Sequence, residues 1–370
     1  MDKIKRFIDV YIPTETCNLQ CSYCYIAQKG LFSKQIAHFS HTPDEIRKAF
    51  SQKKLGGTCL FNLCAGGETL LSPEVLPVVH ELAAEGHYVM IVTNGTVSKA
   101  FEQVTGWEEE IKKRLFFKFS FHYVELKRLN LLEKFTQNVS LVKNAGCSFT
   151  VEVTPSDELI PYLDELKEFS LSAFGAYPHF TIARNGNSDN LDLLTDLSEE
   201  EYVKTFGQFD SAMFDYKMEL YHKKRNEFCY AGCWSLYINL GTGDIIRCYR
   251  AGKIGNIYDD EVIDFSPVGH CCTLPYCFNG HAFLAFGDIP GLDTTNFMQI
   301  RDRVDSQGNH WVNETMQSMF ESKLYESNPE FTPKEMKAAD KRVKAESKPT
   351  LKEQIGKTFI YSAYKKLLKK

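Results

Sequence analysis

The chain has 370 residues, of which 43% are hydrophobic and 25% are charged, so a disordered or collagen-like chain is excluded. Its net charge is −5, but residues 333–370 carry 12 Lys/Arg against 4 Asp/Glu, which leaves the remainder strongly acidic. An acidic body repels phosphate backbones, and we therefore expect no binding to nucleic acid. The N-terminal residues lack the pattern of a secretion signal, and no run approaches 18 apolar residues, so we expect a cytoplasmic protein.

The first 227 residues alternate short apolar runs with longer amphipathic segments. The apolar runs are predicted as strands, at residues 7–12, 59–63, 88–93, 115–121, 148–154 and 179–183. The amphipathic segments are predicted as helices, at residues 43–54, 72–85, 97–113, 124–144, 156–172 and 198–226. This alternation predicts an α/β domain with a parallel sheet, because continuous apolar strands are typical of sheets buried on both faces. Periodicity does not distinguish an open sheet from a barrel.

The pattern changes after about residue 228. Two short β-like runs, at residues 234–240 and 244–248, flank a Gly-Thr-Gly turn and predict a hairpin. From about residue 313 the sequence becomes helical and polar. We therefore expect three parts: a core domain at residues 1–227, a small cysteine-rich domain at 228–290, and a helical extension with a basic tail at 291–370.

Three cysteines, Cys17, Cys21 and Cys24, follow directly after the first predicted strand. Enzymes on parallel sheets place their chemistry at this end of the strands. Three ligands are one short of a closed zinc site, whereas an iron–sulfur cluster held by three cysteines keeps one iron open for chemistry. In a reducing compartment such a group indicates metal binding or catalysis rather than disulfides.

The triad resembles the CX3CX2C signature of radical S-adenosylmethionine (SAM) enzymes, including the aromatic Tyr23 before the third cysteine. The sequences AGGE at 65–68 and TNG at 93–95 resemble further motifs of that family, in the same order. The resemblance implies a partial (β/α)6 TIM-like barrel and a [4Fe–4S] cluster on the three cysteines, with SAM on the fourth iron. Reductive cleavage of SAM would then give a 5′-deoxyadenosyl radical that abstracts a hydrogen atom from the substrate.

The same resemblance implies which residues bind SAM. They lie after successive strands: Gly66, Gly67, Glu68, Thr93, Asn94, Ser120, His122 and Arg184. The glycines and Glu68 would hold the amino group, since glycine allows close backbone approach and a carboxylate suits an ammonium. For Ser120 and His122 the alternative is a polar pair at a strand end, and for Arg184 it is a surface salt bridge. Glu152, on the fifth strand, is a further candidate contact for SAM or substrate.

The C-terminal cysteines carry a second resemblance. Cys233 and Cys248, with Gly243 five residues before the latter, match the hairpin that opens the SPASM and Twitch extensions of radical SAM enzymes. These extensions hold auxiliary iron–sulfur clusters, and the shortened pattern here implies one. The predicted auxiliary ligands are Cys233 and Cys248 together with two of the remaining cysteines Cys229, Cys271, Cys272 and Cys277, of which we favour Cys272 and Cys277. The two spare cysteines, Cys229 and Cys271, are candidate hydrogen-atom donors to a substrate radical. The alternative is a zinc ribbon of four cysteines.

We therefore predict a radical SAM enzyme with two [4Fe–4S] clusters, served by an electron donor such as flavodoxin or ferredoxin. Its substrate is a peptide, or a sugar or other small metabolite that is oxidised or epimerised. The alternatives are a maturase or activase acting on a protein substrate, and a zinc-binding interaction protein. The basic segment 351–370 suits either an interfacial membrane helix or a terminal helix packed on the acidic body, and we favour the second.

Overall fold

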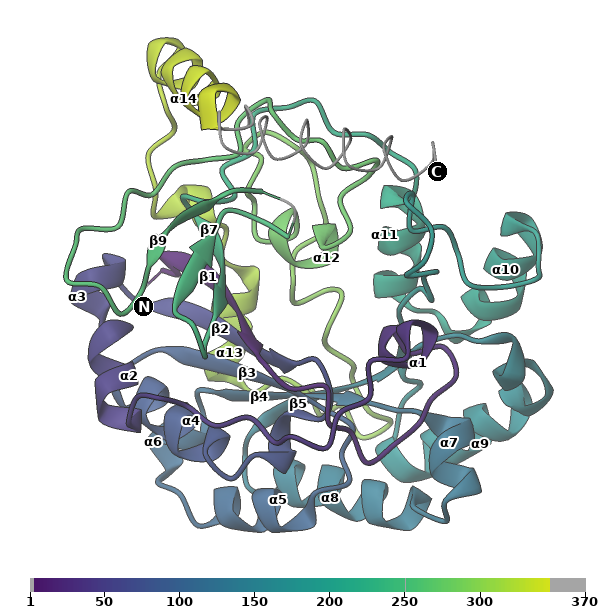
Figure 1. The fold of residues 1–370 in the computed structure, drawn as a ribbon. Coiled ribbons are helices and arrows are strands. Elements are labelled where there is room, and N and C mark those ends of the chain that lie inside the picture. The colour runs from purple at the N-terminus through teal and green to yellow at the C-terminus, as the bar shows by residue number, and fades with distance from the viewer. Residues whose placement is uncertain (1–2, 250, 347–370) are drawn as a thin grey trace, which may run out of the picture.

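The computed structural model describes residues 3–249 and 251–346, and it contains one sheet of nine strands (Figure 1). The strands lie in the order β6-β5-β4-β3-β2-β1-β7-β8-β9. Their bounds are β1 Arg6–Ile12, β2 Cys59–Ala65, β3 Tyr88–Thr93, β4 Leu115–Ser120, β5 Ser148–Val153, β6 His179–Phe180, β7 Ser235–Asn239, β8 Asp244–Ile246 and β9 Lys253–Asn256. The strands from β6 to β7 in this order pair in parallel, and the pairs β7–β8 and β8–β9 are antiparallel. The predicted α/β fold, a partial (β/α)6 barrel, is confirmed.

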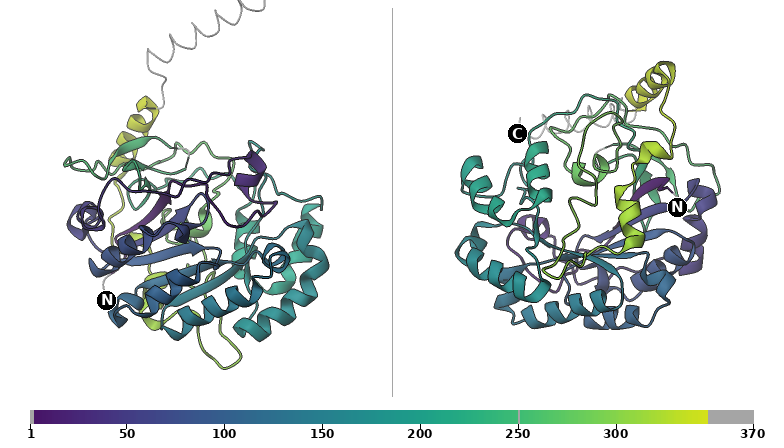
Figure 2. Two further views of the ribbon diagram at one scale, coloured as in Figure 1. Left: turned by 60° about the horizontal axis from the view of Figure 1, so that its bottom comes forward. Right: turned by 180° about the vertical axis from the view of Figure 1, so that it is seen from behind.

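Helices connect the parallel strands and cover one face of the sheet (Figures 1 and 2). The α-helices are α1 Tyr25–Lys29, α2 Pro43–Ala49, α3 Gln52–Leu55, α4 Val75–Ala84, α5 Ser98–Thr105, α6 Glu109–Lys112, α7 Tyr123–Arg128, α8 Leu132–Asn144, α9 Leu163–Phe174, α10 Glu199–Phe206, α11 Ala212–Leu220, α12 Gly280–Phe283, α13 Glu314–Glu321 and α14 Pro333–Glu346. The predicted helices at 43–54, 97–113, 124–144 and 198–226 are each divided in two, and the predicted sixth strand is reduced to two residues.

Alternation along the strands gives the sheet two different faces. On β4, Phe117 and Phe119 are fully buried and pack with the connecting helices, whereas Phe116 and Lys118 point to the other face. On that second face the C-terminal extension fills one end: the rings of Phe116 and Phe320 lie 4.8 Å apart, and Phe320 belongs to α13. α13, in the expected helical extension, therefore lies against the sheet (Figure 2, right) and contributes to the apolar cluster on this face.

The cysteine-rich hairpin joins the same sheet instead of forming its own. β7 pairs in parallel with β1, from Phe7 opposite Ser235 to Tyr11 opposite Asn239, and β8 and β9 extend this edge. Within residues 3–249 and 251–346, no helix has the length and apolar character to cross a membrane. The basic segment 351–370 lies outside the described residues.

Candidate functional site

The cysteine triad lies on the loop between β1 and α1, at the carboxyl edge of the sheet. Cys17, Cys21 and Cys24 line one pocket together with residues that follow β2, β3 and β4. Cys24 is the residue before α1, and its N–H donates to the carbonyl of Cys21 at 3.1 Å, which turns the loop back on itself. The structure therefore brings the three thiols to one place, although they come from a segment without regular structure.

Neighbouring strand ends hold this loop in position. Asn94, after β3, donates to the Asn18 side chain at 2.8 Å and approaches Cys17 Sγ at 3.7 Å. The N–H of Gln20 donates to Glu125 Oε1 at 3.0 Å, which ties the loop to α7. Because these contacts come from separate connections of the sheet, the loop geometry depends on the whole barrel edge.

Gly66 and Gly67 allow the loop after β2 to approach the cysteine loop. The N–H of Gly67 donates to the Thr14 carbonyl at 2.6 Å, and the N–H of Glu68 donates to the Thr16 carbonyl at 2.9 Å. A β-carbon on Gly67 would lie 1.9 Å from the Thr16 carbonyl oxygen, and one on Gly66 would lie 2.6 Å from that of Thr14. Both positions therefore require glycine for backbone packing, whatever further contact they make with a ligand.

We expect Gly67→Ala to displace the cysteine loop, because the added methyl group meets backbone atoms that have nowhere to move. The expected loss is about 3 kcal/mol or more in the free energy of unfolding, together with the iron that the family resemblance predicts on the triad. Chemical denaturation and iron analysis measure both. Gly207→Ala is the matched control, because a β-carbon there meets no atom within 4 Å. Equal stability and iron content in the two variants would contradict this account.

Glu68 is buried, and its carboxylate already accepts three hydrogen bonds. The donors are Thr93 Oγ1 at 2.7 Å, the Asn94 N–H at 2.6 Å and the Leu70 N–H at 2.9 Å. Burial raises the pKa of Glu68, and these hydrogen bonds act in the opposite direction. The carboxylate therefore connects the ends of β2 and β3, and Glu68, Thr93 and Asn94 all line the pocket of the triad.

Ser120 and His122 line the same pocket, but Arg184 does not. His122 Nδ1 lies 2.7 Å from the Tyr23 hydroxyl, and burial lowers the pKa of His122 to about 4, so the imidazole is neutral at physiological pH. This pairing fixes the aromatic residue of the cysteine loop. Arg184 instead donates to the Phe278 carbonyl at 2.9 Å, which connects β6 to the cysteine-rich segment.

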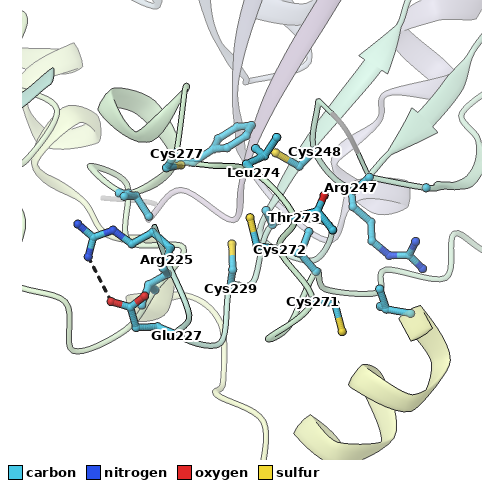
Figure 3. Close-up of a pocket in the computed structure, with 18 of the residues that line it drawn as sticks. Arg225, Glu227, Cys229, Arg247, Cys248, Cys271, Cys272, Thr273, Leu274 and Cys277 are labelled. Atoms are coloured by element: carbon cyan, nitrogen blue, oxygen red, sulfur yellow. Dashed lines mark hydrogen bonds and ion pairs between the residues drawn. The ribbon is translucent and has the colours of Figure 1, made fainter. Parts of the chain in front are cut away.

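A second pocket, of about 230 Å³, contains five more cysteines. They are Cys229, Cys248, Cys271, Cys272 and Cys277. Figure 3 shows the sulfur atoms of Cys229, Cys248, Cys272 and Cys277 gathered around one region, although they come from three separate segments of the chain. Burial raises the pKa of Cys229 and Cys277, and in each case neighbouring cysteine thiols raise it further.

Cys233 and Cys271 lie apart from this group of four. The Cys233 thiol donates to the Phe265 carbonyl at 3.1 Å, does not line the pocket, and packs in the apolar core. Cys271 lines the pocket rim, but its sulfur points toward α14, 3.8 Å from the Asp340 carbonyl oxygen (Figure 3). The structure thus brings Cys248, Cys272 and Cys277 together as expected, but places Cys229 where Cys233 was expected.

Both groups of thiols are candidate sites for a cluster. Among the residues that the structure describes, no three histidine, cysteine or acidic side chains converge on a point that one ion would occupy. In a cubane cluster each cysteine thiolate binds a different iron, so the cysteine sulfurs lie further apart than the ligands of a single metal ion. Since burial raises the pKa of Cys21 and Cys248 to about 12, assembly of a cluster on either thiol would release a proton.

Several polar residues near the triad were not predicted from the sequence. Lys118, Asp9 and Cys64 lie on the second face of the sheet, and it is approached by His281 from α12 and by Arg301 from the C-terminal extension. Lys118 interrupts the apolar run of β4, which is the one sequence signal that singles it out. The position of Arg301 depends on tertiary packing of a loop, which no local pattern reveals.

Comparison with known proteins gives matches of three kinds. Residues 11–116 match the model of the radical SAM superfamily. The 7-carboxy-7-deazaguanine synthase of Aquifex aeolicus (strain VF5) is 31% identical over 104 residues, which cover 28% of this chain and 40% of that enzyme. The chain thus matches about two fifths of the length of this curated relative.

Solved structures of low identity are also similar. Streptococcus suis SuiB bound to its precursor peptide SuiA is 15% identical, with a TM-score of 0.48, over 80% of this chain and 71% of that one. The enzyme anSMEcpe with bound AdoMet is 16% identical, with a TM-score of 0.47, over 70% of this chain and 78% of that one. The family model covers the triad and the segments after β2 and β3, which the structure brings to one pocket. Over residues 11–116 this chain thus matches the radical SAM superfamily.

Proposed function

We propose that this protein is a radical SAM enzyme whose catalytic cluster is held by Cys17, Cys21 and Cys24. The observation that carries the proposal is the shared pocket in which the three thiols meet the segments after β2, β3 and β4. When bound there, a [4Fe–4S] cluster and SAM would supply the reducing electron and the 5′-deoxyadenosyl radical.

The residues around the pocket hold and orient the bound groups. Gly66 and Gly67 let the backbone approach closely, and the remaining acceptor capacity of Glu68 suits the amino group of SAM. Asn94, whose amide lies 3.7 Å from Cys17 Sγ, would donate to a ligand sulfur, and such hydrogen bonds tune the potential of a cluster. Ser120 and His122 form the wall nearest β4, and the structure favours a positioning role for His122 through Tyr23.

We further propose that one auxiliary [4Fe–4S] cluster is held by Cys229, Cys248, Cys272 and Cys277. This set replaces Cys233 by Cys229, because Cys229 lines the second pocket and Cys233 packs in the core. As a ligand Cys229 would not donate a hydrogen atom, and Cys271 faces α14, so neither spare cysteine is favoured for that role. The family resemblance is the basis for two further parts of the proposal. The substrate is a peptide or a small metabolite, and the electron donor is a flavodoxin or a ferredoxin.

Anaerobic reconstitution with iron and sulfide tests the proposed function. We expect broad absorbance near 400 nm, about eight iron atoms per chain for two cubane clusters, and cleavage of SAM after addition of dithionite. Aerobically purified protein incubated with zinc is the control for the alternative of a zinc-binding interaction protein. Colourless protein that retains zinc and leaves SAM intact after reconstitution would contradict the proposal.

A further inference from the structure

A cluster of basic side chains lies on the second face of the sheet, close to the pocket of the triad. It consists of Lys118 on β4, Lys217 on α11, His281 on α12 and Arg301 in the segment between α12 and α13. Burial lowers the pKa of His281 well below its usual range, and the charges of the neighbouring Lys217, Arg301 and Lys118 lower it further. Residues from four distant parts of the chain therefore contribute to one cluster.

The cluster contains buried polar groups that the protein itself does not satisfy. Arg301 is fully buried and donates from Nη1 to Glu152, but its Nε and Nη2 groups have no partner. His281 is 8% exposed, and its Nδ1 is also unpartnered. Buried donors without acceptors are costly, especially on a charged group. Burial lowers the pKa of Lys217 well below its usual range, and neighbouring Arg184 and Arg301 add to this effect.

Both carboxylates near the cluster already have partners. Glu152 is shared among three basic side chains. Burial acts to raise its pKa, but Arg301, Lys118 and Lys217 together lower this pKa to about 2. Asp9 faces Lys118 but accepts hydrogen bonds from Asn62 at 2.7 Å, from Asn279 at 3.2 Å and from Tyr249. No described residue forms a hydrogen bond with the Lys118 ammonium.

Lys118 is the member that a ligand reaches most directly. It is half-buried, whereas Lys217, His281 and Arg301 are buried behind it. It points to the same face of β4 as Ser120, which lines the pocket of the triad, and two residues of a strand span about 7 Å. A group held by Lys118 would therefore lie next to the proposed SAM site, where a substrate must be placed.

We infer that the substrate carries an anionic group, a carboxylate or a phosphate, which Lys118 binds directly and Arg301 and Lys217 attract from behind. The inference rests on the proposed function, because it identifies this face of the sheet as the substrate side. An anion there gives Lys118 a partner and favours the charged form of Lys217, whose pKa burial lowers. A neutral substrate would leave the Lys118 ammonium without a hydrogen-bond partner among the described residues.

Isothermal titration calorimetry tests the inference on the reconstituted protein, saturated with SAM and kept without reductant. Inorganic phosphate and malonate are titrated separately, so that binding of a phosphate is distinguished from binding of a carboxylate. Because SAM is already bound, its own carboxylate does not compete with the titrated anion. We expect 1:1 binding of one of them, and at least about tenfold weaker binding by Lys118→Met, as for the loss of a charged hydrogen bond. Lys118→Gln is a second variant, and Lys118→Arg is expected to retain most of the affinity.

Lys127→Met is the matched control, because Lys127 is an exposed lysine on α7 that pairs with Glu165. Its affinity should equal that of the wild type. Failure of the wild type to bind either anion, or equal affinity in Lys118→Met and wild type, would overturn the inference. SAM cleavage by the wild-type preparation is measured in parallel after reduction. Intact cleavage without anion binding refutes this inference alone, whereas absent cleavage refutes the proposed function.

Discussion

Replacing Cys21 by Ala should remove the catalytic cluster and abolish SAM cleavage. Cys21 is 7% exposed and lies between Cys17 and Cys24 on a loop that the neighbouring strand ends hold in place. With one of three thiolates missing, the cubane cluster has two protein ligands, and the fixed loop offers no replacement. The iron content should fall from about eight to about four atoms per chain, because the auxiliary cluster stays bound. Iron analysis and anaerobic SAM cleavage assays measure the two losses.

Cys147→Ala is the matched control for this variant. Cys147 is 4% exposed and packs in the helix-covered core just before β5. Its loss shortens a buried side chain and lowers stability modestly, but the iron content and SAM cleavage should equal those of the wild type. Wild-type SAM cleavage by Cys21→Ala would contradict the assignment of the catalytic cluster.

The strand–helix alternation of the first half was predictable from the sequence because each connection is local. The apolar run of β3 and the capping box at Thr42 each identify an element without knowledge of the rest of the chain. The triad was predictable for the same reason: three ligands within eight residues on one loop lie close together in any fold that forms the loop. The breaks between α5 and α6, and between α7 and α8, were missed because helical periodicity continues across them.

The ligand set of the second group was less predictable because its members come from separate segments. Spacing along the hairpin singled out Cys233, but the turn at 230–233 directs this thiol to the Phe265 carbonyl and into the core. Cys229 reaches the pocket because its backbone pairs with Gly269, an isolated bridge between distant segments. Arg301 was missed for a similar reason, since its contact with Glu152 spans 149 residues. Sequence spacing predicts neighbours within a loop, but not which way a side chain points after a turn.

The variants Cys229→Ala and Cys233→Ala should therefore have opposite effects on the auxiliary cluster. We expect Cys229→Ala to lose about four iron atoms per chain, because it removes one of four proposed ligands. Cys233→Ala should retain all of them and lose only packing and one thiol hydrogen bond. Iron analysis distinguishes the two variants. Electron paramagnetic resonance of the reduced proteins is the control, because the signal of the cluster on the triad, which SAM perturbs, should persist in both variants.

Cys229→Ala and Cys233→Ala are well-matched variants, because the two thiols are four residues apart in the sequence and burial raises the pKa of both. A general effect of removing a buried cysteine would therefore appear in both variants. Loss of iron in Cys233→Ala with full iron in Cys229→Ala would restore the ligand set that sequence spacing predicts. Full iron in both would contradict an auxiliary cluster in this pocket. Loss in Cys229→Ala alone would establish that the bridge to Gly269, and not the spacing of the hairpin, selects the fourth ligand.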